Sequence, residues 1–185
     1  MVIVNKYFNN LCTDIINKAK KIKLIISDVD GVLTDGSIFI DKDDNDGLVR
    51  FSVLDGMGII MAKKCGINFA VISGRSSTQV EKRCKKIKID HIYLGVKDKT
   101  VILHQLKNEL NLNYDNIAYI GDDINDLRSL ELVGLKVAPP NASYYILKEV
   151  DYITNKMGGF GAVRELIDLI LESQNILFEY LNKHI

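Results

Sequence analysis

The sequence predicts an α/β fold, a Rossmann-like three-layer domain with a mainly parallel sheet. Short apolar runs rich in β-branched residues alternate with segments of helical periodicity along most of the chain. Glycines repeatedly stand where a helical segment ends and the next apolar run begins. This alternation is typical of strand–helix–strand units, whose right-handed crossovers place helices on both faces of a parallel sheet.

The 185 residues are enough for one domain with a sizeable core, and no repeat, low-complexity tract or linker divides them. We therefore expect a single domain over residues 1–185. The 24 basic and 24 acidic residues give no net field that would favour nucleic acid or an anionic membrane. The sequence shows no signal-peptide core and no apolar run of bilayer length, and its three cysteines form no zinc motif. These features favour a cytoplasmic protein that binds neither nucleic acid nor membrane.

The first two predicted elements are an amphipathic helix and a buried strand. Apolar residues between Phe8 and Ala19 recur with helical spacing. The run at 24–26 is apolar and β-branched, as in strands that are buried on both faces. Asp28 and Asp30 come directly after this run, and extended backbone would point both carboxylates to the same side.

A β-hairpin is predicted next. Ser37–Ile40 and Leu48–Phe51 are its expected strands, and the segment between them is a polar turn. The alternating acidic residues of the turn resemble a calcium loop, but Asp46 stands where that loop needs glycine and Ser52 where it needs a bidentate glutamate. We interpret the segment as the tip of a hairpin flap at about residues 37–52.

Helices and strands then alternate to the end of the chain. Helical patterns and their stop signals predict helices at 56–65, 77–86, 99–110, a segment that ends at 133, 142–149 and a closing segment from 162. Apolar runs predict strands at 67–72, 92–94, 117–120, 135–138 and 152–153. A glycine-rich loop precedes the closing helix.

Three of the predicted strands end in polar clusters. In chain order the clusters are Asp28, Asp30 and Thr34; Ser73, Gly74 and Arg75; and Gly121, Asp122, Asp123 and Asp126. Ligands of open α/β sheets bind at the carboxyl ends of the strands, so we expect the clusters to converge. Each cluster alone is also explained by a turn or a helix cap. Together, each at a strand end, they predict one site.

The residue types of these clusters favour magnesium-dependent phosphoryl transfer. Two carboxylates aimed at one point, here Asp28 and Asp30, repel each other unless a cation or a proton lies between them. Mg²⁺ binds through one or two carboxylates together with water and phosphate oxygens. An aspartate can also act as a nucleophile and form an aspartyl phosphate. Lys99, at the start of a predicted helix, would supply positive charge, and Ser73 would donate a hydrogen bond.

Four short segments resemble, in order, the four motifs of the haloacid dehalogenase-superfamily phosphatases: 28–34, 73–75, Lys99 and 121–126. Between about Ile22 and Leu171 the chain more narrowly resembles the capless 3-deoxy-D-manno-octulosonate 8-phosphate (KDO 8-phosphate) phosphatases of that superfamily. Segments 55–59 and 158–165 carry this narrower resemblance.

The resemblance implies a phosphomonoesterase that hydrolyses KDO 8-phosphate to KDO and phosphate, in lipopolysaccharide precursor synthesis. Asp28 would be the nucleophile that forms the aspartyl phosphate, and Asp30 the general acid and base. Mg²⁺ would be held by the Asp28 carboxylate, the Asp30 main-chain carbonyl and Asp122. Two further acidic groups, Asp123 and Asp126, would orient water molecules and the lysine. The residues expected to bind the substrate are Asp30, Thr34, Ser73, Gly74, Arg75 and Lys99.

The spacing of the motifs leaves no room for a cap domain. Larger members of the superfamily insert a cap between the first and second motifs or between the second and third. Here 45 positions separate Asp28 from Ser73 and 26 separate Ser73 from Lys99, and predicted elements fill both intervals. The family resemblance implies that the hairpin instead covers the site of a neighbouring subunit in a homotetramer.

One position departs from the family pattern. Members often carry Arg or Lys between the glycines of the late loop, where this chain has Phe160. A cation there would recognise the carboxylate of a sugar acid. The alternative substrate is therefore a nine-carbon sugar acid 9-phosphate of the acylneuraminate or ketodeoxynonulosonate type. Arg75, Arg83 or Arg164 could supply the missing charge.

Two alternatives come from another functional class. A signalling receiver domain also combines acidic residues, a hydroxyl, a lysine and Mg²⁺, but its phosphoacceptor follows a middle strand. Such domains also lack a second aspartate two residues later, unlike Asp28 and Asp30. A catalytically silent phosphatase-like module would have no physical need to keep Ser73, Lys99 and Asp122 together with both aspartates.

Overall fold

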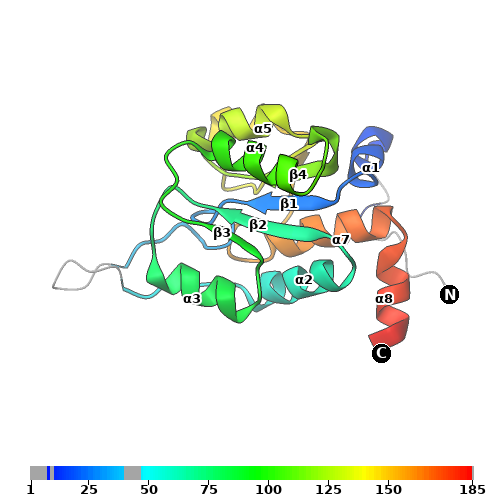
Figure 1. Cartoon of the computed structure of the whole chain (residues 1–185), viewed down its shortest axis with the longest axis horizontal. Coiled ribbons are helices and arrows are strands. Elements are labelled where there is room, and N and C mark those ends of the chain that lie inside the picture. The colour runs from blue at the N-terminus through cyan, green and yellow to red at the C-terminus, as the bar shows by residue number, and fades with distance from the viewer. Residues whose placement is uncertain (1–7, 9–10, 40–46, 185) are drawn as a thin grey trace.

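The structure, a computed structural model, describes residues 8, 11–39 and 47–184, which form a six-stranded sheet flanked by helices (Figure 1). The strand order is β3-β2-β1-β4-β5-β6, and every pairing is parallel. The strands are β1 (Leu24–Ser27), β2 (Asn68–Ile72), β3 (His91–Tyr93), β4 (Ile117–Ile120), β5 (Leu135–Ala138) and β6 (Tyr152–Ile153). The predicted α/β class and parallel sheet are confirmed.

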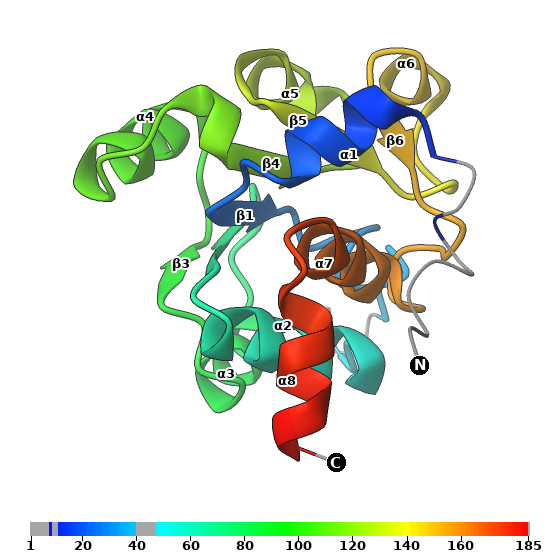
Figure 2. The ribbon, with the colours of Figure 1, turned by 90° about the vertical axis from the view of Figure 1, so that its right-hand side faces the viewer.

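Helices cover both faces of the sheet (Figures 1 and 2). In the order of the chain they are α1 (Thr13–Ala19), α2 (Val53–Lys64), α3 (Thr78–Lys86), α4 (Lys99–Glu109), α5 (Leu127–Leu132), α6 (Tyr144–Leu147), α7 (Ala162–Ser173) and α8 (Ile176–His184). One apolar layer contains buried side chains of α1, α2, α3 and α7, and the other those of α4, α5 and α6. No helix in the described part of the chain is both long and apolar enough to cross a membrane.

The two apolar layers follow from the alternation of side chains along the strands. Ile25 of β1 and Val71 of β2 belong to the layer under α2 and α7, whereas Leu24 and Ile26 belong to the layer under α4 and α5. All four residues of β1 are buried. A central parallel strand has helices on both sides, so it carries apolar residues at every position rather than at every second one.

Several element boundaries differ from the sequence prediction. In the described residues the first helix begins only at Thr13, after an extended Cys12. Helix α2 begins three residues early, because Ser52 caps it and accepts the Leu54 N–H at 3.2 Å. The closing segment is two helices rather than one, since Asn175 adopts a left-handed φ of 61° between α7 and α8.

The predicted hairpin is only partly described. Residues 37–39 and 47–52 contain no strand, so the expected hairpin strands are not confirmed in these ranges. The two segments do meet, because the Gly47 N–H donates to the Phe39 carbonyl at 2.5 Å. The predicted turn at 40–46 lies outside the described residues.

Candidate active site

The carboxyl ends of β1, β2 and β4 meet at one edge of the sheet, as the sequence predicts. A cavity of about 380 Å³ opens there. Its walls are Asp28, Asp30, Gly31, Gly36, Ser73, Gly74, Arg75, Asp122, Asp123 and Asn125. All three predicted polar clusters therefore contribute to the same cavity.

Asp28 is fixed by the strand that it follows. Its N–H continues the ladder of the sheet and donates to the Ile120 carbonyl at 3.0 Å. The chain then turns sharply, and the N–H groups of Leu33 and Thr34 both donate to the Val29 carbonyl, at 2.9 and 3.0 Å. The side chain of Asp28 is nearly buried at the base of the cavity.

Thr34 does not lie on the cavity wall. It is buried, and its hydroxyl donates to the Val29 carbonyl at 3.2 Å while accepting the Gly31 N–H at 3.4 Å. These bonds hold the turn that presents Asp28 and Asp30. The structure therefore places Thr34 behind the loop rather than in contact with the cavity.

A buried lysine connects two of the carboxylates. Lys99 Nζ lies 2.9 Å from Asp28 Oδ1 and 2.7 Å from Asp126 Oδ1. Only 2% of the lysine side chain is exposed. Opposite charge at this depth is what allows two buried carboxylates to stay close together, because an unpaired buried ion is costly. Lys99 is predicted to hold the phosphoryl group, but the structure places it in an ion pair with Asp28 and Asp126 and not in the cavity wall.

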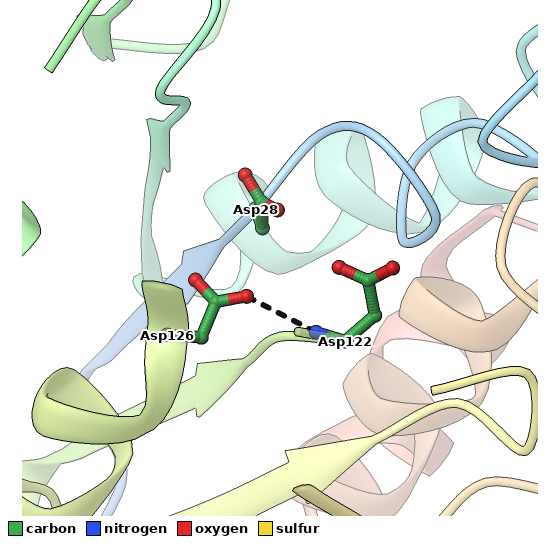
Figure 3. A group of neighbouring side chains, drawn as sticks. All are labelled: Asp28, Asp122 and Asp126. Carbon is green, nitrogen blue, oxygen red and sulfur yellow. Dashed lines mark hydrogen bonds between the residues drawn. The ribbon is translucent and has the colours of Figure 1, made fainter. Parts of the chain in front are cut away.

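Asp126 is the anchor of the third cluster. It is fully buried and accepts hydrogen bonds from the Tyr119 hydroxyl at 2.7 Å and from the Asp122 and Asp123 N–H groups at 3.1 and 3.4 Å. Figure 3 shows the bond to Asp122 and the way in which Asp28, Asp122 and Asp126 gather. With Lys99 as a fourth donor, Asp126 holds its neighbours in place rather than facing the cavity.

The carboxylates of Asp28, Asp122 and Asp126 offer oxygen atoms that lie within 4.8 Å of one another. Burial and the neighbouring Asp126 raise the pKa of Asp28 to about 6, against the opposing effect of Lys99. Burial, followed by the charges of Asp28 and Asp126, raises the pKa of Asp122 to about 7. Burial alone would lower the pKa of Lys99, but the two carboxylates outweigh it and raise that pKa.

These residues fit a divalent cation. Oxygen ligands suit Mg²⁺, and a cation between Asp28 and Asp122 would offset the burial and the neighbouring negative charges that raise both pKa values. Asp126 already accepts four hydrogen bonds, so it is better suited to hold Lys99 than to bind metal.

Gly31 brings its backbone into contact with the Asp122 carboxylate. Its φ is +82°, and a Cβ at this position would lie within 2 Å of Asp122 Oδ2. Gly121 is similarly close to Asp126, where a Cβ would lie 2.6 Å from Oδ2. Both glycines are therefore required by close approach to the carboxylates.

The second cluster forms the opposite wall of the cavity. Ser73 is buried, and its hydroxyl oxygen accepts the Arg75 N–H at 3.1 Å, which leaves the hydroxyl hydrogen available to the cavity. Arg75 Nη1 lies 3.6 Å from Asp30 Oδ1, so the first and second clusters meet at the cavity wall. Gly74 and Asp123 also line the wall.

The prediction did not single out the wall residues Gly31, Gly36 and Asn125, and it missed two further residues that support the site. Tyr119 lies within β4, where its buried hydroxyl needs a partner and finds it in Asp126; a tyrosine in an apolar strand was the available signal. Asn141 donates from Nδ2 to the Gly31 carbonyl at 2.9 Å and accepts the Gly158 N–H on Oδ1 at 2.7 Å. It joins the loop after β1 to the glycine-rich loop before α7, and nothing in the local sequence indicates this.

Comparison with known proteins shows similarity to one superfamily of hydrolases, both in sequence and in structure. A family model for haloacid dehalogenase-like hydrolases matches residues 95–167. The 3-deoxy-D-manno-octulosonate 8-phosphate phosphatase KdsC of Escherichia coli is 41% identical over 172 residues, which are 93% of this chain and 91% of that protein.

Solved structures extend the similarity to the whole fold. The phosphatase of the same name from Moraxella catarrhalis, crystallised with magnesium ion, phosphate ion and KDO, matches with a TM-score of 0.90 and 39% identity, over 95% of this chain and 100% of that one. The Yersinia pestis phosphatase of that name matches with a TM-score of 0.88 and 40% identity, over 91% and 90% of the two chains.

Proposed function

Because this chain belongs to the haloacid dehalogenase-like hydrolases, in the family of the 3-deoxy-D-manno-octulosonate 8-phosphate phosphatases, we propose that it hydrolyses KDO 8-phosphate to KDO and phosphate with Mg²⁺. The observation that carries the proposal is the pair of carboxylates, Asp28 and Asp122, held at the base of the cavity by Lys99 and Asp126. The relatives support this activity and not a receiver domain or a silent module.

Asp28 is the nucleophile in this proposal. Its carboxylate oxygen attacks the phosphorus, the bond from phosphorus to the sugar oxygen breaks, and an aspartyl phosphate forms. Lys99 pairs with the carboxylate at 2.9 Å and keeps it ionised against its burial. The fixed position of Asp28 at the end of β1 serves in-line attack, which depends mainly on positioning.

Asp30 is the general acid and base. It donates a proton to the departing sugar oxygen, and it then removes a proton from the water that attacks the aspartyl phosphate. That attack breaks the bond between phosphorus and the Asp28 oxygen and returns the carboxylate. Asp30 lines the cavity two residues beyond the nucleophile and is 36% exposed, so it can reach both the leaving group and water.

When bound, Mg²⁺ neutralises negative charge on the transferring phosphoryl oxygens. Asp28, the Asp30 main-chain carbonyl and Asp122 are the residues that would hold it. Ser73 lines the phosphoryl pocket and donates a hydrogen bond, and Lys99 supplies positive charge from beneath it. Gly74 and Arg75 form the wall next to the sugar, whereas Thr34 contributes through the shape of the loop. Asp123 orients water at the open side of the cavity.

We also propose that the protein acts as a single capless domain in a homotetramer. Four large apolar side chains near the predicted flap are exposed: Ile38 at 55%, Phe39 at 55%, Leu48 at 83% and Val53 at 78%. Such a group of exposed apolar residues is costly in a monomer and typical of an interface. Sedimentation analysis of the active enzyme tests this proposal, and a monomeric mass with full activity would refute it.

We place the reaction in the cytoplasm, as an early step of lipopolysaccharide precursor synthesis. The described structure supports a reducing compartment, because Cys12, Cys65 and Cys84 are all free thiols. Cell fractionation with an antibody against the chain would test the location, and recovery outside the cytoplasmic fraction would contradict it.

Phosphate release from a panel of esters tests the activity. The panel contains KDO 8-phosphate, a nine-carbon sugar acid 9-phosphate, a hexose phosphate and a nucleotide, each with and without Mg²⁺. We expect preference for KDO 8-phosphate, complete loss on chelation of the metal, and loss by at least about 10³-fold in Asp28→Asn, which cannot form the acyl phosphate. Preference for the nine-carbon ester would keep the mechanism and change the substrate.

A further inference from the structure

Arg50 lies against the ring of Phe160, the residue that departs from the family pattern. The guanidinium carbon is 3.9 Å from the ring centroid, which is a close cation–π contact. Its Nη1 is 3.6 Å from Asp35 Oδ2, and 48% of the arginine side chain remains exposed. Phe160 thus holds a cation that comes from a different part of the chain.

The segment that this cation contacts borders the cavity. Asp35 directly precedes Gly36, which forms part of the cavity wall. The loop that carries Phe160 is pressed against the same segment, because the Gly159 N–H donates to the Val32 carbonyl at 2.9 Å. A Cβ on Gly159 would lie 2.5 Å from the Asp35 nitrogen, so the two loops are in direct backbone contact.

Because 48% of the Arg50 side chain is exposed, part of the guanidinium remains accessible to a ligand. A guanidinium that stacks on a ring through its face keeps its N–H groups in the plane, where they can bind a carboxylate with two hydrogen bonds. The 3.6 Å separation from Asp35 exceeds hydrogen-bond length. Asp35 also has another partner, since its Oδ1 accepts the Ser37 N–H at 3.0 Å. That bond is the main cause of the lowered pKa of Asp35, and Arg50 is a lesser one.

We propose that Arg50 binds the carboxylate of the sugar-acid substrate and that Phe160 positions it. The inference rests on the proposed function, because it requires a substrate that carries a carboxylate at the end remote from its phosphate. In this chain the positive charge is on the second predicted strand of the flap, and the late loop supplies the aromatic face that holds it. Arg50 is then a specificity-determining residue and Phe160 a positioning residue.

Steady-state kinetics of the magnesium-loaded enzyme test the inference with two substrates. KDO 8-phosphate carries the carboxylate, and p-nitrophenyl phosphate does not. We expect Arg50→Gln to raise KM for KDO 8-phosphate by about tenfold or more, to leave kcat within about twofold, and to leave kcat/KM for p-nitrophenyl phosphate within about twofold. The KM of Arg50→Lys for KDO 8-phosphate should lie between those of the wild type and Arg50→Gln, because an ammonium keeps the charge but not the planar pair of donors. Phe160→Leu should raise the same KM by a smaller factor.

Lys156→Gln is the matched control, since it removes an exposed cation from the neighbouring loop without touching the stack. It should change neither KM. Inhibition by free KDO gives a second measurement, and it should weaken in Arg50→Gln but not in Lys156→Gln. Equal effects of Arg50→Gln on both substrates, or on neither, would overturn the inference and leave Arg50 as a structural partner of Asp35. If the wild-type enzyme hydrolyses no sugar-acid phosphate, the proposed function fails first, and no variant is needed to see it.

Discussion

At the scale of single residues, Gly31 shows how tightly the site is built. The loop that follows Asp28 passes so close to Asp122 that no side chain fits between them. The position also has a left-handed φ, which disfavours every other residue. Any substitution of Gly31 is therefore unfavourable for two separate reasons: the backbone conformation is strained, and the new side chain collides with Asp122.

Gly31→Ala and Gly66→Ala separate these two effects. Gly66 has a φ of +81°, almost equal to that of Gly31, but a Cβ there would meet nothing within 4 Å. We expect Gly66→Ala to lower the free energy of unfolding by about 1 kcal/mol and to leave turnover unchanged. Gly31→Ala should in addition displace Asp122 and lower kcat/KM by at least about 10²-fold. Denaturant titration and phosphate release measure both, and equal turnover in the two variants would contradict the interpretation.

Residue identities at the site were largely predictable from the sequence. Asp28, Asp30, Ser73 and Asp122 follow strands, so the common edge of a parallel sheet brings them together whatever the details of packing. Thr34 belongs to the same segment but faces the Val29 carbonyl, because the direction of a side chain in an irregular turn depends on hydrogen bonds that the sequence does not specify.

At the scale of elements, the start of α7 depends on a residue of another helix. Gly161 stands at its N-cap position with a φ of 110° and no side chain to accept the free N–H groups. Asp55 of α2 accepts the Arg164 N–H at 2.8 Å instead. Burial raises the pKa of Asp55 to about 6, despite this hydrogen bond from the backbone. The residue that caps α7 is therefore an aspartate whose charged form is disfavoured by burial.

Asp55 makes stability depend on pH in a direction that can be checked. An aspartate whose folded pKa lies above its unfolded value binds more protons in the folded state, so its contribution to stability declines as pH rises from about 4 to about 6. The full decline is at most about 3 kcal/mol. Asp55→Asn keeps the acceptor for Arg164 and does not titrate. Chemical unfolding at pH 4.5 and at pH 7 gives the free energy of unfolding of both proteins. From the lower to the higher pH, the wild type should lose stability relative to the variant. A constant difference between the two proteins would refute this role.

Element boundaries were predicted less well than element types. Ser52 and Asn175 illustrate the reason: one is an ordinary cap that moves the start of α2, and the other is a left-handed residue that divides the closing helical segment. The position of each boundary depends on how the neighbouring helices pack. The apolar period alone is compatible with both outcomes.

At the scale of the whole molecule, metal binding is coupled to folding. Burial, followed by neighbouring carboxylates, raises the pKa of Asp28 to about 6 and that of Asp122 to about 7, so a cation that neutralises these groups favours the folded state. A ligand that binds only the folded state raises the free energy of unfolding, by about 2.7 kcal/mol at one hundred times its dissociation constant. Mg²⁺ should therefore raise the melting temperature of the metal-free protein.

Asp122→Asn should abolish most of this shift, since it removes one of the two carboxylates that face each other. Asp115→Asn is the control, because it removes the same charge just before β4, at the opposite end of the strand that Asp122 follows. Thermal unfolding with chelator and with excess Mg²⁺ measures the shift in all three proteins. An equal shift in Asp122→Asn and the wild type would show that the metal binds elsewhere.

The amino-acid sequence is enough to predict the fold class, the parallel sheet and the edge at which the polar clusters meet, because these depend on periodicity and on the polarity of parallel strands. The contacts beneath that edge and beside it depend on how the folded chain packs. Lys99 pairs with Asp28, Asn141 joins two loops, and Arg50 lies over the ring of Phe160. These contacts join residues far apart in the chain, so they follow from how helices and loops pack and not from any local pattern.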